Sequence, residues 1–175
     1  MYMKNLLFVL IITALTVSFT ACGGDNSSNV WRNANIAAYD SITKVPGYSE
    51  ILTPTGPTGV YRKVLNSGTG TEYPLQTSNV KVLYEGTYYD GTIFDVGTSQ
   101  SNAPVEFSLG GQSVVRGFSF ALQQMVVGDK WEIWIPYYLG YGSSDYMDPN
   151  TYQIICKAYT TLVFQVELVS ITQYP

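Results

Sequence analysis

The chain has 175 residues, of which 46% are hydrophobic and only 13% are charged, and its formal net charge at pH 7 is −4. This length suffices for one domain with a hydrophobic core and some additional sequence, whereas the acidic balance, without any cluster of Lys or Arg, excludes nucleic-acid binding through a basic surface. Histidine is absent and no CxxC motif or carboxylate cluster occurs, so His-based catalytic triads are excluded and we expect neither a metal nor a cofactor.

Residues 1–21 have the pattern of an export signal. Lys4 supplies a positive charge, residues 6–19 form an apolar run too short for a comfortable membrane span, and small residues follow where a signal peptidase cleaves. The FTAC motif that ends at Cys22 resembles a bacterial lipobox, which implies cleavage before Cys22 and its lipidation. We therefore expect a bacterial cell-envelope protein with a lipid anchor in a membrane; the alternative is an ordinary secreted protein with an incidental cysteine. Lipidation leaves Cys156 as the only free thiol, which excludes an intramolecular disulfide.

Residues 22–58 are predicted to tether this anchor to the globular part. Apolar residues lie loosely at helical spacing in segment 30–44, which predicts a short helix that a Pro-Gly pair then ends. Residues 48–59 contain two prolines and several turn-forming steps, and they predict a linker or a first edge segment. The globular domain is then expected over residues 59–175.

The globular part has the alternating pattern of a β-rich domain. Strands are predicted over residues 60–65, 80–89, 92–95, 105–108, 130–135 and 161–169. The Asp90-Gly91 step predicts a hairpin turn. Apolar residues recur at helical spacing from Val115 to Met125 and predict a short helix over residues 116–124. Because one short helix among strands must bury its apolar face on a sheet, the predicted fold class is α+β.

Two side chains are the best candidates for chemistry. Asp95 ends a strand rich in large apolar residues, although an aspartate in this place most often caps a turn. Tyr141 lies between two glycines that expose its ring, although packing is the commoner role of such a residue. Ser108 and Ser113 lack an activating base, which argues against serine hydrolysis. The residues alone thus indicate a small exported β-rich domain with an aromatic interior.

Six motifs in a single order resemble those of the FKBP-type peptidyl-prolyl cis–trans isomerases. They are VLYEG at 82–86, DGTIFD at 90–95, FSLG at 107–110 with VVRGF at 114–118, MVVG at 125–128, LGYG at 139–142 and TLVFQVEL at 161–168. The resemblance extends over about residues 59–168, nearly all of the globular part. It implies a strongly twisted antiparallel sheet, a half-barrel, wrapped around one short helix.

The resemblance also implies a site and an activity. The implied catalytic residues are Tyr84, Phe94, Asp95, Val115, Phe118, Tyr141 and Phe164, and the implied substrate-binding residues are Val105, Val114 and Ile155. Phe118 would form the pocket floor, and the Val115 N–H and the Tyr141 hydroxyl would donate hydrogen bonds to bound peptide. The implied activity is isomerisation of X–Pro bonds during the folding of exported proteins. Proline-containing polypeptides are the expected partners, and macrolide inhibitors are expected ligands of the same pocket.

Departures from the family pattern leave a second function open. Segment 142–160 is longer than the compact family form and lacks its Ile-Pro-Pro step, so the position of the usual apolar rim residue stays open between Ile155 and Cys156. Ser113 stands where glutamate is common. No arginine occurs between Asp95 and Val105, so Asp95 is expected to depend on the Tyr84 hydroxyl and on backbone donors. The alternative function is a non-catalytic FKBP-like module that binds proline-containing segments or a partner protein.

Overall fold

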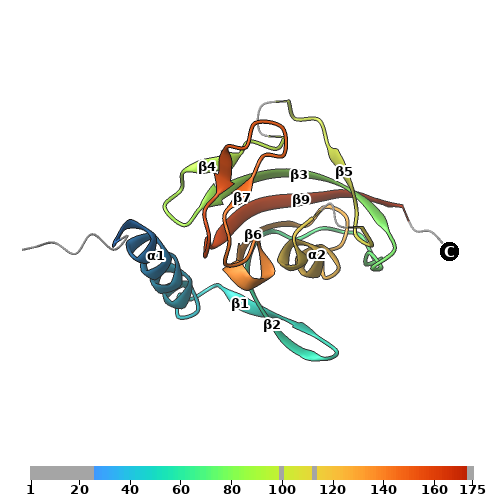
Figure 1. The fold of residues 1–175 in the computed structure, drawn as a ribbon. Coiled ribbons are helices and arrows are strands. Elements are labelled where there is room, and N and C mark those ends of the chain that lie inside the picture. Colours follow the sequence, from blue (N-terminus) through green and yellow to red (C-terminus); the bar gives the residue numbers. More distant parts are fainter. Residues whose placement is uncertain (1–25, 99–100, 112–113, 173–175) are drawn as a thin grey trace, which may run out of the picture.

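The computed structural model describes residues 26–98, 101–111 and 114–172 (Figure 1). The predictions for the export signal, Cys22 and Ser113 lie outside these residues. The described elements are α1 (Asn26–Ile42), β1 (Ser49–Thr53), β2 (Gly56–Asn66), β3 (Asn79–Tyr88), β4 (Ile93–Asp95), β5 (Val105–Ser108), α2 (Arg116–Leu122), β6 (Lys130–Ile135), the short 3₁₀ helix η1 (Tyr137–Leu139), β7 (Tyr146–Met147), β8 (Ile154–Cys156) and β9 (Leu162–Thr172).

Seven strands form one antiparallel sheet, and its main path has the order β1-β2-β6-β9-β3-β4. β5 pairs with the first residues of β3, and β4 pairs with residues near the end of β3. Both strands therefore lie along the same edge of β3. The sheet curves around α2 (Figure 1). This is the predicted half-barrel around one short helix. β7 and β8 form a separate two-stranded hairpin.

The core lies between the concave face of the sheet and α2. The inward side chains of β6 and β9 are buried: Trp131, Ile133, Ile135, Leu162, Phe164, Val166 and Leu168. Gln165 between them is exposed. The alternation predicted for both strands is confirmed, because successive side chains of a strand point to opposite faces of the sheet.

α2 approaches the sheet closely because its second residue is glycine. A Cβ atom on Gly117 would lie 2.3 Å from Cγ2 of Ile135, so a larger residue would push the helix away from β6. The helix begins at Arg116 as predicted and ends at Leu122, with Gln123 as its C-cap. Its buried face includes Phe118, which this contact brings down onto the sheet.

α1 begins earlier than predicted and packs on the domain through polar contacts. Asn35 is fully buried, and its Oδ1 accepts a hydrogen bond from the Thr161 N–H at 2.8 Å. The Thr161 hydroxyl donates to the Asn35 carbonyl at 3.2 Å, and Trp31 Nε1 donates to the Thr160 hydroxyl at 3.1 Å. These contacts attach α1 to the chain just before β9, across more than a hundred residues of sequence.

The segment predicted as a linker or first edge segment contributes an edge strand. β1 pairs with β2 through a tight turn, in which Thr53 lies opposite Gly56. β2 begins at Gly56, before the predicted domain boundary at residue 59. Residues 49–58 therefore extend the sheet.

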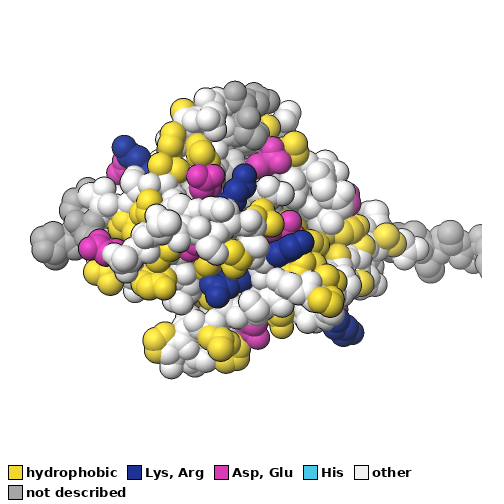
Figure 2. Space-filling view, turned by 180° about the vertical axis from the view of Figure 1, so that it is seen from behind, with side chains coloured by type: hydrophobic (Ala, Val, Ile, Leu, Met, Phe, Trp, Pro, Cys, Tyr) yellow, Lys and Arg dark blue, Asp and Glu magenta, His cyan; other side chains and the backbone are white. Residues whose placement is uncertain are grey.

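Ion pairs between side chains contribute little to the fold within the described residues. Figure 2 shows acidic and basic side chains interspersed over one face, without a continuous field of either sign. Within the described residues, the ion pair is that of Lys81 with Glu106 at 4.0 Å, and both side chains are about half exposed, where such pairs stabilise little. In the part of the chain that the structure describes, no helix is both long enough and apolar enough to cross a membrane.

Candidate active site

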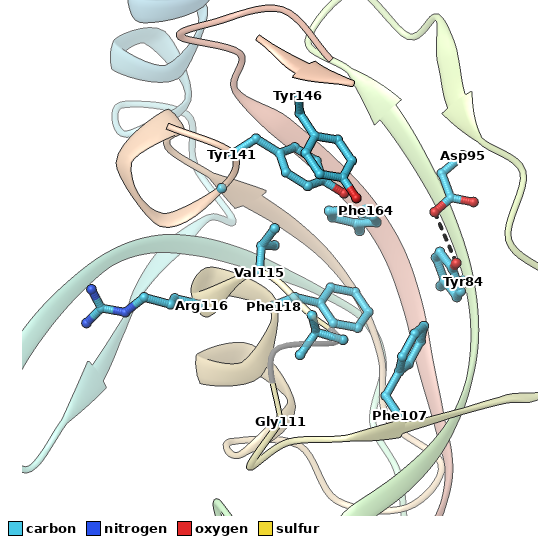
Figure 3. Close-up of a pocket in the computed structure, with 12 residues that line it drawn as sticks. Tyr84, Asp95, Phe107, Gly111, Val115, Arg116, Phe118, Tyr141, Tyr146 and Phe164 are labelled. Atoms are coloured by element: carbon cyan, nitrogen blue, oxygen red, sulfur yellow. Dashed lines mark hydrogen bonds between the residues drawn. The ribbon is translucent and has the colours of Figure 1, made fainter. Parts of the chain in front are cut away.

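A pocket of about 470 Å³ opens between α2 and the concave face of the sheet (Figure 3). Its lining comes from the sheet, from the start of α2 and from the loops beside them: Tyr84, Asp95, Phe107, Gly111, Val114, Val115, Arg116, Phe118, Gly140, Tyr141, Tyr146 and Phe164. Seven of these were predicted from the sequence, and the fold brings them to one place from five of the six resembling motifs.

The floor of the pocket is a cluster of aromatic rings around Phe118. This side chain is only 3% exposed, and its ring centroid lies 5.0 Å from that of Phe164 and 6.0 Å from those of Tyr84 and Phe107. All three contacts are edge-to-face, an arrangement that aromatic rings favour. The cluster offers a ligand an apolar surface that is already packed in place.

Asp95 lies at the pocket edge and is held by two donors. The Tyr84 hydroxyl donates to Oδ2 at 3.0 Å, and the Gly97 N–H donates to Oδ1 at 2.9 Å (Figure 3). The hydrogen bond expected from Tyr84 and the expected backbone donor are thus both present. Burial, followed by the nearby Asp95 carboxylate, raises the pKa of Tyr84, so this hydroxyl keeps its proton and remains a donor.

Two further donors at the pocket have no acceptor within the described residues. The Val115 carbonyl accepts hydrogen bonds from the N–H groups of Phe118 and Ser119 at the start of α2, but no described group accepts from the Val115 N–H. The Tyr141 hydroxyl likewise has no acceptor among them. Burial raises the pKa of Tyr141 to about 12, with smaller contributions from neighbouring groups. Both donors are therefore free to bind a ligand carbonyl.

Phe94 lies behind the pocket rather than in its lining. Its ring stacks on Tyr88 at 5.2 Å and meets Phe164 edge-to-face at 5.6 Å. A Cβ on Gly86 would lie 2.8 Å from both phenylalanine rings, so the glycine of the VLYEG motif makes room for this packing. Phe94 supports the pocket wall through Phe164.

Two residues that the resemblance implied as substrate-binding also lie outside the lining. Val105 is 36% exposed on β5. Ile155 lies on β8, and its carbonyl accepts a hydrogen bond from the Tyr88 hydroxyl at 2.7 Å. The sequence could not place Ile155, because the family's Ile-Pro-Pro step is missing there and a hairpin takes its place.

Three lining side chains were missed in the sequence. Phe107 follows Val105 by two residues on β5, a period-two signal that could have placed it on the pocket face. Arg116 precedes the α2 glycine, and its guanidinium points away from the floor (Figure 3). Tyr146 has no local signal, because its place depends on the β7–β8 hairpin; its ring lies parallel to that of Tyr141.

Comparison with known proteins identifies the family. Residues 70–169 match the profile of the FKBP-type peptidyl-prolyl cis-trans isomerase family. Over 118 residues the chain is 34% identical to the outer membrane protein MIP of Legionella longbeachae, a match that covers 66% of this chain and 45% of that protein. Over 113 residues it is 38% identical to the FKBP-type 22 kDa peptidyl-prolyl cis-trans isomerase of Escherichia coli K12, covering 65% and 50%. The chain spans about half the length of these curated relatives.

The fold is also that of a solved structure. The crystal structure of a peptidyl-prolyl cis-trans isomerase from Pseudomonas syringae superposes with a TM-score of 0.69 at 32% identity, covering 86% of this chain and all of that one. The predicted FKBP-like α+β fold is confirmed.

Proposed function

The chain belongs to the family of FKBP-type peptidyl-prolyl cis-trans isomerases, and we propose from this premise that it isomerises X–Pro bonds in polypeptides. The observation that carries the proposal is the combination in one pocket of an aromatic floor with two unused hydrogen-bond donors. The floor suits a proline ring, and the donors suit the carbonyl groups of the peptide beside it.

Such a pocket can catalyse rotation without a nucleophile. Rotation about the peptide bond faces a barrier of about 18–20 kcal/mol, because amide resonance must be broken. The twisted amide has less charge separation than the planar one, so transfer from water to an apolar pocket favours the twisted form. This is preferential binding of the transition state, the property that lowers a barrier.

The described residues have distinct parts in this mechanism. The proline ring lies on Phe118, while the Val115 N–H and the Tyr141 hydroxyl hold the flanking carbonyl groups. Asp95, fixed by Tyr84, presents negative charge at the pocket edge. Beside the carbonyl oxygen of the X–Pro bond, that charge disfavours the planar, charge-separated amide more than the twisted one.

Proline-limited refolding tests the proposed function. Uncatalysed X–Pro isomerisation takes tens to hundreds of seconds and can limit the folding of a protein. We expect catalytic amounts of the full chain to shorten the slow refolding phase of a protein limited by one X–Pro bond. The β7–β8 hairpin, which stands where the family's Ile-Pro-Pro step is missing and lines the pocket through Tyr146, favours a second candidate function, a module that binds such segments. Binding of the unfolded protein without acceleration would leave only that function.

We further propose that the protein acts on exported proteins from a lipid anchor at Cys22. Only residues 23–25 separate Cys22 from α1, and four residue steps reach at most about 14 Å. Since α1 is attached to the domain through Asn35, the isomerase would stay close to the membrane surface.

Replacing the proposed anchor residue tests this part. In bacterial cells, the wild-type chain should be found with membranes and carry an acylated cysteine, whereas Cys22→Ala should be released or remain unprocessed. Wild-type protein that is soluble with an unmodified Cys22 would contradict the anchor.

We propose that macrolide inhibitors compete with proline peptides for this pocket, because an apolar ring system would cover the Phe118 side chain that forms its floor. Displacement of a bound proline peptide by such a compound is the corresponding test.

A further inference from the structure

Tyr146 lines the pocket from outside the motifs that identified the family. Its ring lies almost parallel to that of Tyr141, with centroids 4.1 Å apart and an interplanar angle of 13°. Figure 3 shows the two rings overlapping at one side of the pocket, with their hydroxyl groups on the same side. Tyr146 therefore covers a face of the ring that carries one of the two unused donors.

The backbone around Tyr141 is held independently of this contact. The Gly142 N–H donates to the Tyr137 carbonyl at 2.9 Å, and the Gly142 carbonyl accepts from the Tyr159 N–H at 2.9 Å. The side chain of Tyr141, in contrast, makes no hydrogen bond to a described residue. The direction of the Tyr141 hydroxyl therefore depends on the contacts of its ring.

Tyr146 is itself held in place by the β7–β8 hairpin. It pairs with the buried Cys156 on β8. The carboxylate of the preceding residue, Asp145, accepts a hydrogen bond from the Ala158 N–H at 2.8 Å. The hairpin thus fixes the backbone from which the Tyr146 ring covers one face of Tyr141, while the rest of the Tyr141 ring packs against the hydrophobic core.

We propose that Tyr146 is a positioning residue, whose ring holds the Tyr141 hydroxyl in the direction needed to bind a peptide carbonyl. The inference rests on the proposed function and concerns the same pocket. Ordering a side chain when a ligand binds costs free energy, and a contact that orders it beforehand removes that cost from binding. Burial, the largest cause of the raised pKa of Tyr141, agrees with a ring that is already covered in the free protein.

The test separates the ring of Tyr146 from its hydroxyl. Tyr146→Ala removes both, Tyr146→Leu replaces the ring with an aliphatic side chain, and Tyr146→Phe keeps the ring. Met147→Ala is the matched control, because Met147 is the next residue on β7, is 49% exposed and does not line the pocket. Each variant is made in the full chain. The dissociation constant for a peptide with one X–Pro bond is measured by NMR titration, and the cis–trans exchange rate of the peptide is measured at saturation.

We expect Tyr146→Ala and Tyr146→Leu to weaken peptide binding by about two- to tenfold, the range that corresponds to the interaction of an aromatic pair. The exchange rate at saturation should change less, and Tyr146→Phe should recover most of the loss. In a Tyr141→Phe background the effect of Tyr146→Ala should nearly vanish, because the donor that it positions is already gone.

Several outcomes would overturn the inference. In the first, Tyr146→Ala binds the peptide as tightly as Met147→Ala does. In the second, Tyr146→Phe loses as much peptide affinity as Tyr146→Ala. In the third, Tyr146→Ala weakens peptide binding as much in the Tyr141→Phe background as in the wild-type chain. A wild-type chain that binds peptide without accelerating exchange would remove the proposed activity instead. The dissociation constants would still test the position of Tyr141 in that case.

Discussion

Asp95 has one donor on each carboxylate oxygen, the Tyr84 hydroxyl and the Gly97 N–H. Asp95→Asn keeps the size of the side chain and removes its charge. We therefore expect a folded variant whose acceleration of X–Pro exchange is about tenfold lower, which corresponds to about 1.4 kcal/mol in the barrier. NMR exchange spectroscopy on a proline peptide measures this without a coupled protease.

Asp90→Asn is the matched control for Asp95. Asp90 belongs to the same hairpin and its Oδ1 accepts the Thr92 N–H at 3.0 Å, and an Asn-Gly step suits such a turn as well as Asp-Gly. Asp90→Asn should keep full activity. An Asp95→Asn variant as active as Asp90→Asn would remove the carboxylate from the mechanism.

Tyr141→Phe removes only the hydroxyl that has no acceptor within the described residues. The fold should remain, since no internal hydrogen bond among those residues is lost, while the dissociation constant for a proline peptide should rise about tenfold, the loss of one ligand hydrogen bond. Tyr152→Phe, at a side chain 78% exposed, is the control in the same titration. Equal affinity of the two variants would show that Tyr141 is not a donor to the peptide.

At the scale of elements, α1 depends on a buried amide. Asn35→Ala leaves the buried Thr161 N–H without its acceptor, and an unsatisfied buried donor costs about 1–3 kcal/mol. We expect a loss of this size in the free energy of unfolding measured by urea denaturation. Asn33→Ala, on the exposed side of the same helix, should change it little. A negligible difference between the two variants would mean that α1 does not fold as part of the domain.

The elements that the sequence predicted well are those whose signal is local. β6 and β9 alternate in hydrophobicity, α2 follows helical spacing, and Asp90-Gly91 marks its turn. The β7–β8 hairpin could not be predicted, because it depends on contacts that no local pattern marks, such as the hydrogen bond between Asp145 and Ala158, 13 residues apart. Tyr146 was missed for the same reason, since its role arises from contact with a second segment.

Site prediction was limited in a similar way. The motifs placed Phe118, Asp95 and Tyr141 correctly in one pocket. The motifs could not distinguish a side chain that lines the pocket from one that packs behind the lining. Phe94 packs behind it, because Tyr88 and Phe164 enclose its ring. A motif identifies the residues that build a pocket wall without identifying which of them face its interior.

For the molecule as a whole, partly buried tyrosines contribute to the response of stability to alkaline pH. Burial is the largest cause that raises the pKa values of Tyr39, Tyr84 and Tyr141 above the ordinary 10.0, for Tyr141 to about 12. Such a residue binds its proton more tightly in the folded protein than in the unfolded one. Its contribution to stability is therefore complete below pH 10 and is lost as the pH rises toward 12.

The free energy of unfolding should accordingly fall between pH 10 and pH 12, as measured by urea denaturation at fixed ionic strength. Tyr84→Phe removes one of these groups and should make the decline shallower. A decline of unchanged slope in this variant would contradict the assignment of the effect to the buried tyrosines.

In the proposed function, this pocket accelerates rotation about X–Pro bonds. The most direct measurement is two-dimensional NMR exchange spectroscopy on a peptide with one X–Pro bond and a substoichiometric amount of the full chain. Without a catalyst, exchange takes tens of seconds or longer and gives no cross-peaks at a mixing time of about one second. We predict cis–trans cross-peaks at that mixing time, which Asp95→Asn weakens. A peptide that binds the chain, seen in its shifted resonances, but gives no cross-peaks would contradict the claim.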